Sequence, residues 1–244
     1  MLGRLQTSIA AALVLLSLAA SISGASGTPW PALLGPREVF PPEVSTAVER
    51  VWTEPTLRRT INGPPVRVPL DVYEAFVDAP DVTAAAARFS RIRTFDIHAL
   101  DDDSYLGDDG DGAQFVSRVL RREPRRRVLL SEGQLVNPLL GTINASALTV
   151  LDLEPQDGEV SPKLTAYMYI AKGGGATLAR LLVPRFGFIA DRKLGEGLRA
   201  TSAVAEWAVE RSGSFCDWLA HEPLSPVHRD RIQAALPTCA AASH

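Results

Sequence analysis

An abrupt change of hydrophobic period constrains this chain more than any other feature of its sequence. Residues 163–171 alternate strictly between two faces, and one of these faces is entirely apolar. Such alternation predicts a β-strand with one buried face. After the three glycines at 173–175, the apolar residues recur at helical steps, and residues 189–211 predict a long helix. A strand that leads into one long helix favours a fold in which the helix covers a sheet.

The segments before this point predict further strands. Residues 141–158 form a second long strand that ends in a turn, and its odd positions are the more apolar set. Residues 114–121 and 127–132 predict a hairpin, and residues 66–77 predict a strand that Pro69 interrupts. The resulting fold class is α+β: a curved antiparallel sheet wrapped around a long C-terminal helix. The absence of βαβ alternation argues against a dinucleotide-binding fold.

The rest of the chain divides into an amino-terminal leader, an extension and a tail. A basic residue, an apolar run and small residues predict a signal peptide over residues 1–25. That run is shorter than the roughly 20 residues that cross a bilayer, and we expect no transmembrane segment in the mature chain. Residues 26–63 form a proline-rich extension with a short helix, residues 64–212 form the main domain, and residues 213–244 form a tail. We therefore expect an exported protein, either periplasmic or secreted.

Cysteine content and charge limit the chemistry. The only cysteines are Cys216 and Cys239, both in the tail. In an exported protein this pair predicts a disulfide bond, with two free, partly buried thiols as the alternative. Because the sequence lacks CxxC and zinc-binding spacings, we expect no metal and no cofactor. The formal net charge is −3, and nothing in the sequence favours nucleic acid binding.

Five segments carry a family resemblance: VDAP at 77–80, REPRRRVLL at 122–130, ALTVLDLEPQDG at 147–158, KLTAYMYI at 163–170 and EGLRATSAVAEWA at 196–208. They resemble the START-like or SRPBCC superfamily, which has a helix-grip fold and includes polyketide cyclases and carriers of hydrophobic ligands. The resemblance extends from about Val66 to Ser212. It implies that the inner sheet face and the long helix line an apolar cavity, but it implies no catalytic residue, since the superfamily has no universal ones. The small residues 83–87 stand where the superfamily tends to carry a large residue, and this predicts a wider cavity at that end.

The predicted long helix also favours a cavity, because its inner stripe is mostly small. Only Leu194 and Leu198 are bulky on that stripe. Small side chains that face a concave sheet leave space, which either closer packing of the helix or a ligand must fill. We predict that a hydrophobic small molecule or lipid is the ligand. The predicted lining residues are Phe115, Leu164, Met168, Ile170, Leu194, Leu198 and Thr201.

Two other functions stay open. An enzyme on the same fold, either a cyclase or a hydrolase, would use His98 with Tyr73, Tyr167 or Tyr169 as acid or base. It requires at least two of these polar side chains to meet inside the cavity. A structural or interaction protein of the cell envelope would instead leave a wide apolar patch exposed. We favour binding, and the sequence does not establish an enzyme.

The aspartates between Asp101 and Asp111 raise a further alternative, because an oxygen-rich loop suits calcium. However, Gly107 occupies the first ligand place when the calcium-loop pattern is aligned to end at Gly112. The composition predicts a solvated turn more simply. The arginine-rich hairpin tip at 121–127 would meet this loop, anionic lipid or solvent.

Overall fold

The computed structural model describes residues 30–137, 141–171 and 183–241, so the predicted signal peptide lies outside the described residues. The strands form one seven-stranded sheet in the order β1-β7-β6-β5-β4-β3-β2, and every neighbouring pair is antiparallel. The strands are β1 (Leu57–Asn62), β2 (Asp96–Ala99), β3 (Ser104–Asp108), β4 (Ala113–Glu123), β5 (Arg126–Asn137), β6 (Gly141–Gln156) and β7 (Glu159–Ile170).

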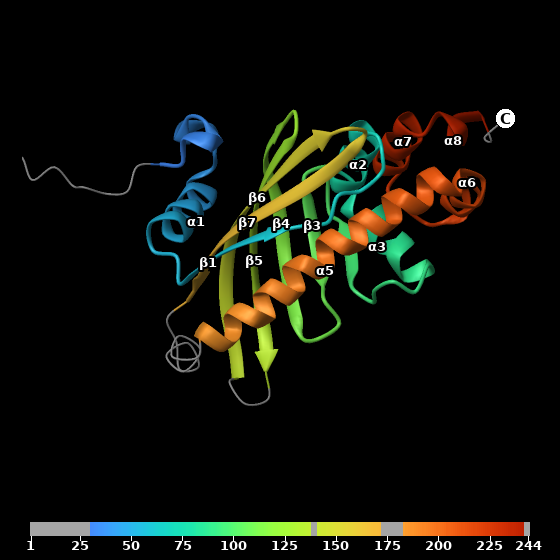
Figure 1. Cartoon of the computed structure of the whole chain (residues 1–244). Coiled ribbons are helices and arrows are strands. Elements are labelled where there is room, and N and C mark those ends of the chain that lie inside the picture. The colour runs from blue at the N-terminus through green and yellow to red at the C-terminus, as the bar shows by residue number, and fades with distance from the viewer. Residues whose placement is uncertain (1–29, 138–140, 172–182, 242–244) are drawn as a thin grey trace, which may run out of the picture.

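Helices lie on both sides of this sheet. The long helix α5 (Val183–Glu210) crosses the concave face, while α1 (Pro42–Thr53) lies on the opposite, convex face (Figure 1). The predicted α+β fold, with a curved antiparallel sheet and a long C-terminal helix, is confirmed. The helices are η1 (Ala32–Leu34), η2 (Arg37–Val39), α1 (Pro42–Thr53), α2 (Leu70–Val77), α3 (Pro80–Phe89), α5 (Val183–Glu210), α6 (Ser212–His221), α7 (Pro226–Ala235) and α8 (Pro237–Ala241).

The two sheet faces belong to two separate apolar clusters. On β6, Leu151 and Leu153 point to the concave side and pack with residues of α2, α3, α5 and α6. Their neighbours Leu148 and Val150 point to the convex side and pack with α1. Because side chains alternate along a strand, one strand feeds both clusters. The sheet is therefore covered on both faces over these strands.

The proline-rich extension forms the convex cover. Val48 and Val51 of α1 are fully buried, and Leu34 of η1 is nearly so. Trp52 lies against Tyr167, with ring centroids 4.7 Å apart. The extension is thus part of the folded structure and buries an apolar sheet face.

The described part of the C-terminal tail is mostly helical. Residues 212–221 form α6 directly after α5, because Phe215, Trp218 and Leu219 occupy one buried helical face. Gly213 lies inside α6 and does not end the helical structure there. Two further helices, α7 and α8, complete the part of the tail that the structure describes.

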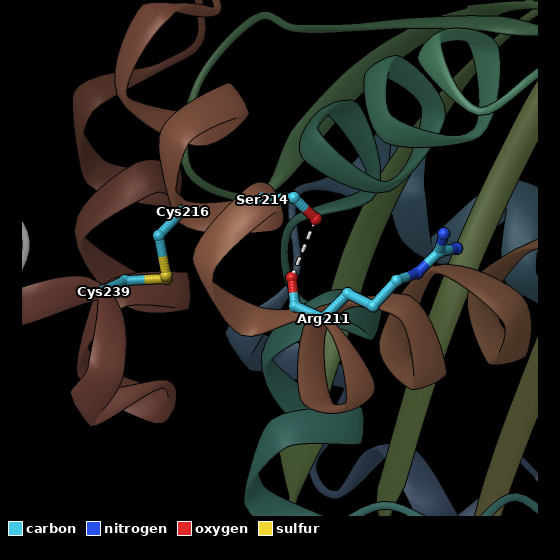
Figure 2. The surroundings of a disulfide bond; sticks show 4 residues. All are labelled: Arg211, Ser214, Cys216 and Cys239. Atoms are coloured by element: carbon cyan, nitrogen blue, oxygen red, sulfur yellow. Dashed lines mark hydrogen bonds between the residues drawn. A yellow bond between two sulfur atoms is a disulfide. The ribbon is translucent and has the colours of Figure 1, made fainter.

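The predicted disulfide bond is confirmed, since Cys216 of α6 is bonded to Cys239 of α8 (Figure 2). The same figure shows the junction of α5 and α6, where the Ser214 hydroxyl donates a hydrogen bond to the Arg211 carbonyl at 3.0 Å. The disulfide bond joins two cysteines with a sequence separation of 23. We expect a disulfide that closes a loop of this size to contribute about 3 kcal/mol to stability in the chain-entropy model.

Two predicted elements are wrong. Residues 70–77 form α2 rather than a strand, and Pro69 precedes the helix at its N-cap. Val72, Tyr73 and Phe76 are buried on the inner side of α2. Within the predicted loop at 101–112, residues 104–108 form β3, which pairs with β2 and β4. The sheet also includes β1 at 57–62, and the predicted domain boundaries at 64 and 212 stay predictions.

We expect Gly197→Ala to stabilise the protein. Gly197 lies inside α5, and a Cβ atom added there meets no atom within 4 Å. Replacing a helical glycine with alanine contributes about 1 kcal/mol, which raises the melting temperature by roughly 2–4 °C in a protein of this size. Thermal unfolding followed by circular dichroism measures the change.

The matched control is Gly133→Ala in β5. There the added Cβ lies 2.2 Å from the backbone oxygen of Gln114, an impossible separation. Overpacking of this kind typically destabilises a protein by about 1–3 kcal/mol. Equal melting temperatures for the two variants would contradict the described packing.

Candidate functional site

Small residues form the centre of the concave face. Ser131 and Gly133 of β5 lie opposite Ala147 and Ala145 of β6. These strands are in the middle of the sheet, yet all of these residues keep accessible surface. By contrast, Leu148 of β6 is fully buried on the convex side. The concave face is therefore less tightly covered than the convex face at its centre.

Larger side chains border this centre on both sides. Phe115 of β4 lies opposite both Gly107 and Gly133. A Cβ added to Gly107 would stand 2.2 Å from the Phe115 ring, so the ring lies along the sheet and over Gly107. On the other side, Met168 and Ile170 of β7 pair with the small residues of β6. All three large side chains are half-buried.

The remaining predicted lining residues lie near the apolar cluster or on α5. Leu164 of β7 packs against the concave-side cluster, and Leu198 of α5 is buried within it. Leu194 and Thr201 of α5 are half-buried. The Thr201 hydroxyl donates to the Gly197 carbonyl at 3.1 Å. That these residues contact one ligand stays a prediction.

Ion pairs connect α5 to strands near both edges of the sheet. Arg59 of β1 lies 3.1 Å from Asp191 of α5. Lys193 of α5 lies 3.1 Å from Asp109 and also binds Asp111, both in the β3–β4 turn. Burial opposes the charge on Lys193, but the hydrogen bonds that its ammonium group donates to these carboxylates raise its pKa. α5 is therefore fixed to β1 at one end of the strand order and to the β3–β4 turn near the other.

The same contacts account for much of the aspartate-rich segment. Asp109 accepts from its own loop as well as from Lys193, and Asp103 pairs with Arg122 of the hairpin. Among the residues that the structure describes, no group of three or more histidine, cysteine, aspartate or glutamate side chains is arranged to hold a metal ion. The contact of the arginine-rich hairpin with this segment is one of the alternatives that the sequence left open.

The residues named for an enzyme do not meet in one place. His98 is exposed, at the edge of the sheet on β2. Tyr167 and Tyr169 point to the convex side, where Trp52 and Arg50 cover their rings. The enzyme alternative required at least two of these polar side chains to meet inside the cavity, and His98, Tyr167 and Tyr169 do not meet there.

Tyr73 lies apart from them, buried on α2. Its hydroxyl stands 3.3 Å from that of Ser202 on α5. Burial raises the pKa of Tyr73 to about 12, and the bond to Ser202 opposes this only in part. The phenol is therefore protonated at neutral pH and is unsuited to act as a base.

A buried polar cluster that the sequence analysis did not single out joins the tail to the domain. His228 of α7 is fully buried, and its Nδ1 lies 2.8 Å from Asp81 Oδ1, although the two atoms are not aligned as a hydrogen bond. Tyr105 of β3 stacks beside His228, with ring centroids 5.6 Å apart. The Tyr105 hydroxyl donates to backbone carbonyls, including that of Asp78 at 3.3 Å. All three residues are buried, and the cluster joins α7 to α3 and β3.

Comparison with known proteins gives partial likenesses. No family model matches the chain, and a search of curated proteins also finds no match. A conserved protein from Geobacillus kaustophilus matches with a TM-score of 0.45 and 14% identity, over 62% of this chain and 97% of that chain. Ara h 8.0201 matches with a TM-score of 0.39 and 11% identity, over 61% and 98%. DynU16, a putative protein in the dynemicin biosynthetic locus, matches with a TM-score of 0.35 and 16% identity, over 64% and 47%.

We take the fold from the strand order and from the position of α5 across the concave face. The chain has a START-like, helix-grip fold. None of the described helices combines the length and the apolar composition that a membrane-spanning helix needs.

Proposed function

We propose that this protein binds a hydrophobic small molecule or lipid on the concave face, between the sheet and α5. The observation that carries the proposal is the contrast between the two sheet faces. At the centre of β5 and β6 the concave residues Ser131, Gly133, Ala145 and Ala147 are small and keep accessible surface, whereas Leu130 and Leu148 on the convex side are large and buried. Leaving apolar space empty in a core is unfavourable, and an apolar ligand removes that penalty.

The side chains around this space suit an apolar ligand. Leu129 of β5, Met168 and Ile170 are apolar and half-buried. Methionine adapts its shape to irregular partners, which suits a wall that must fit a ligand. Among the described residues, those predicted for the alternative enzyme, His98 with Tyr73, Tyr167 or Tyr169, lie apart, and we therefore favour binding.

Native mass spectrometry of the purified full chain, combined with solvent extraction, tests the proposal. We expect an extractable apolar molecule, or uptake of the neutral dye Nile red with a rise in its fluorescence. The variant Ala147→Trp should abolish dye uptake, because the indole fills the centre of the concave face. Its matched control is Asn144→Trp, on the same strand but exposed and pointing to the convex side.

The two tryptophan variants separate binding from folding. Both should keep the circular dichroism spectrum of the parent protein. Dye uptake that survives in Ala147→Trp, or that is absent from the parent protein and all variants, would contradict binding on the concave face.

We also propose that the protein acts after export. The predicted leader at 1–25 and the bond between Cys216 and Cys239 support this, since structural disulfides persist in oxidising compartments. Fractionation of cells that express the full chain, with thiol labelling before and after reduction, tests it. Recovery of the protein in the cytoplasm with both thiols labelled would contradict export.

A further inference from the structure

Three hydroxyl groups lie on neighbouring strands of the concave face. Ser117 of β4 is opposite Ser131 of β5, and Ser131 is opposite Ala147 of β6. Thr149 is two residues along β6 and shares the face of Ala147. Diagonal neighbours of this kind in an antiparallel pair lie about 7–8 Å apart. The hydroxyls therefore form a small polar group on an otherwise mainly apolar surface.

These hydroxyls have hydrogen-bonding capacity to spare. The oxygens of Ser117 and Ser131 are 2.6 Å apart, and they share a single hydrogen bond. One of the two hydroxyl hydrogens is therefore left over. Thr149 makes no side-chain hydrogen bond within the part of the chain that the structure describes. The serine pair of β4 and β5 and Thr149 of β6 thus each offer one hydroxyl donor on the concave face.

The cations around the same face already have partners. Arg59 pairs with Asp191 and Lys193 pairs with Asp109. Arg127 of β5, on the concave side, pairs with Asp78 at 2.7 Å. Within the described residues these three cations are therefore not free to neutralise an anionic ligand. Moving an unpaired carboxylate from water to such a surface is strongly unfavourable.

We propose that the site selects a neutral apolar molecule that carries a hydrogen-bond acceptor within its carbon skeleton, such as a ketone or ester oxygen, over a plain hydrocarbon or a free fatty acid. This inference rests on the proposed binding function. A ligand that displaces water from Ser131 and Thr149 must supply an acceptor, because otherwise it leaves buried donors unpaired. Sites that hydrogen-bond a ligand discriminate strongly against an analogue that lacks the bonding group.

Displacement of Nile red by three probes of equal chain length tests this selection. The probes are nonan-5-one, nonane and nonanoate, and their dissociation constants are measured on the parent protein and on Thr149→Val and Ser131→Ala. We expect each substitution to weaken nonan-5-one about tenfold, the typical effect of one lost hydrogen bond to a buried donor. Binding of nonane should stay within about twofold. Nonanoate should bind more weakly than nonan-5-one to the parent protein.

The matched control is Thr165→Val. Thr165 lies on β7 facing the convex side, and its hydroxyl is 3.2 Å from that of Thr60. This variant should leave all three dissociation constants unchanged. If the ketone binds no better to the parent protein than to Thr149→Val and Ser131→Ala, the inference is overturned while the binding function stands. If none of the probes displaces Nile red and the dye itself does not bind, the proposed function fails as well.

Discussion

A variant that lacks residues 30–53 is expected not to fold as a monomer, because the convex face of the sheet loses its cover. The deleted segment contributes Leu34, Val44, Val48 and Val51 to the convex cluster. Burial of one such aliphatic side chain contributes roughly 1.5–3 kcal/mol, and a typical domain is stable by only about 5–15 kcal/mol. Their loss alone approaches the whole stability of the fold.

The sheet residues beneath the segment add to this effect. Val128, Leu130, Leu148 and Val150 are buried on the convex side and would become exposed to water. An exposed apolar sheet face of this kind favours association. We expect aggregation in size-exclusion chromatography and no cooperative thermal transition. A truncated protein that melts at the temperature of the full chain would contradict an essential role of the extension.

A point variant checks the same claim without removing residues. Val48→Asp places a carboxylate at a fully buried position of α1. Its control is Thr46→Asp, at an exposed position of the same helix. We expect the first variant to unfold or aggregate and the second to change stability by no more than about 0.5 kcal/mol. Similar urea midpoints for the two would show that the cluster contributes little.

The convex cover also explains a pattern that the sequence analysis left unexplained. The even positions of residues 141–158 are a mixed set, and only Leu148 and Val150 in it are strongly apolar. Both lie beneath α1, while Asn144 and Glu154 on the same side do not. A strand buried on both faces over part of its length cannot show simple alternation. The cause lies in a distant segment, about 100 residues earlier in the chain.

The elements that local pattern fixes were predicted well. The strand at 163–171, the hairpin around Pro124, the long helix and the disulfide bond are all present. In each case the decisive signal is local: a period, a turn residue or the number of cysteines. The START-like fold followed from their order together with the family resemblance.

The elements that depend on tertiary contacts were predicted poorly. In residues 70–77 the apolar side chains are dense enough to fit a strand, and burial against α5 and α7 is what makes them a helix. In β3, Tyr105 is buried because His228 of the distant tail lies beside it. Short segments whose partners lie far along the chain carry little signal of their own.

The candidate site shows the same division. The alternation of side chains along each strand correctly placed Met168, Ile170 and Thr149 on the more apolar face. However, the small centre of the face arises only from strand register, which sets Ser131 and Gly133 against the alanines of β6. Register is not readable from one strand alone. To find the cluster of three hydroxyls from sequence, one would have to ask which polar residues occupy the strand positions that point to the same face as the apolar ones.

The second large effect is expected at the junction of the arginine-rich hairpin with the turn between α2 and α3. Arg127 is 6% exposed, and its guanidinium binds both oxygens of Asp78, with Nε to Oδ1 at 2.7 Å and an Nη to Oδ2 at 2.8 Å. Burial opposes the charge, but the hydrogen bonds and attraction from Asp78 and the charge of Glu74 raise the pKa of Arg127. We expect Arg127→Met to lower the free energy of unfolding by about 3–5 kcal/mol, because it leaves Asp78 without this buried partner.

The adjacent arginine is the control. Arg126 pairs with Asp152 at 2.6 Å, but their side chains are 42% and 28% exposed. An exposed pair of this kind contributes no more than about 1 kcal/mol. Urea unfolding of Arg127→Met and Arg126→Met should therefore give clearly different midpoints, although the substitutions are identical in chemistry and adjacent in sequence.

A double variant separates the two reasons why Arg127 could matter. If the loss in Arg127→Met comes from a carboxylate left without its buried partner, then replacing Asp78 with leucine in the same chain removes that charge and should recover part of the stability. Asp78 also faces Arg122, at 3.2 Å, so the recovery should be incomplete. If the double variant is instead as unstable as the sum of the single ones, the ion pair is not what couples the hairpin to the turn. The packing of the Arg127 side chain would then couple the hairpin to the turn between α2 and α3, and this contact would be apolar in origin.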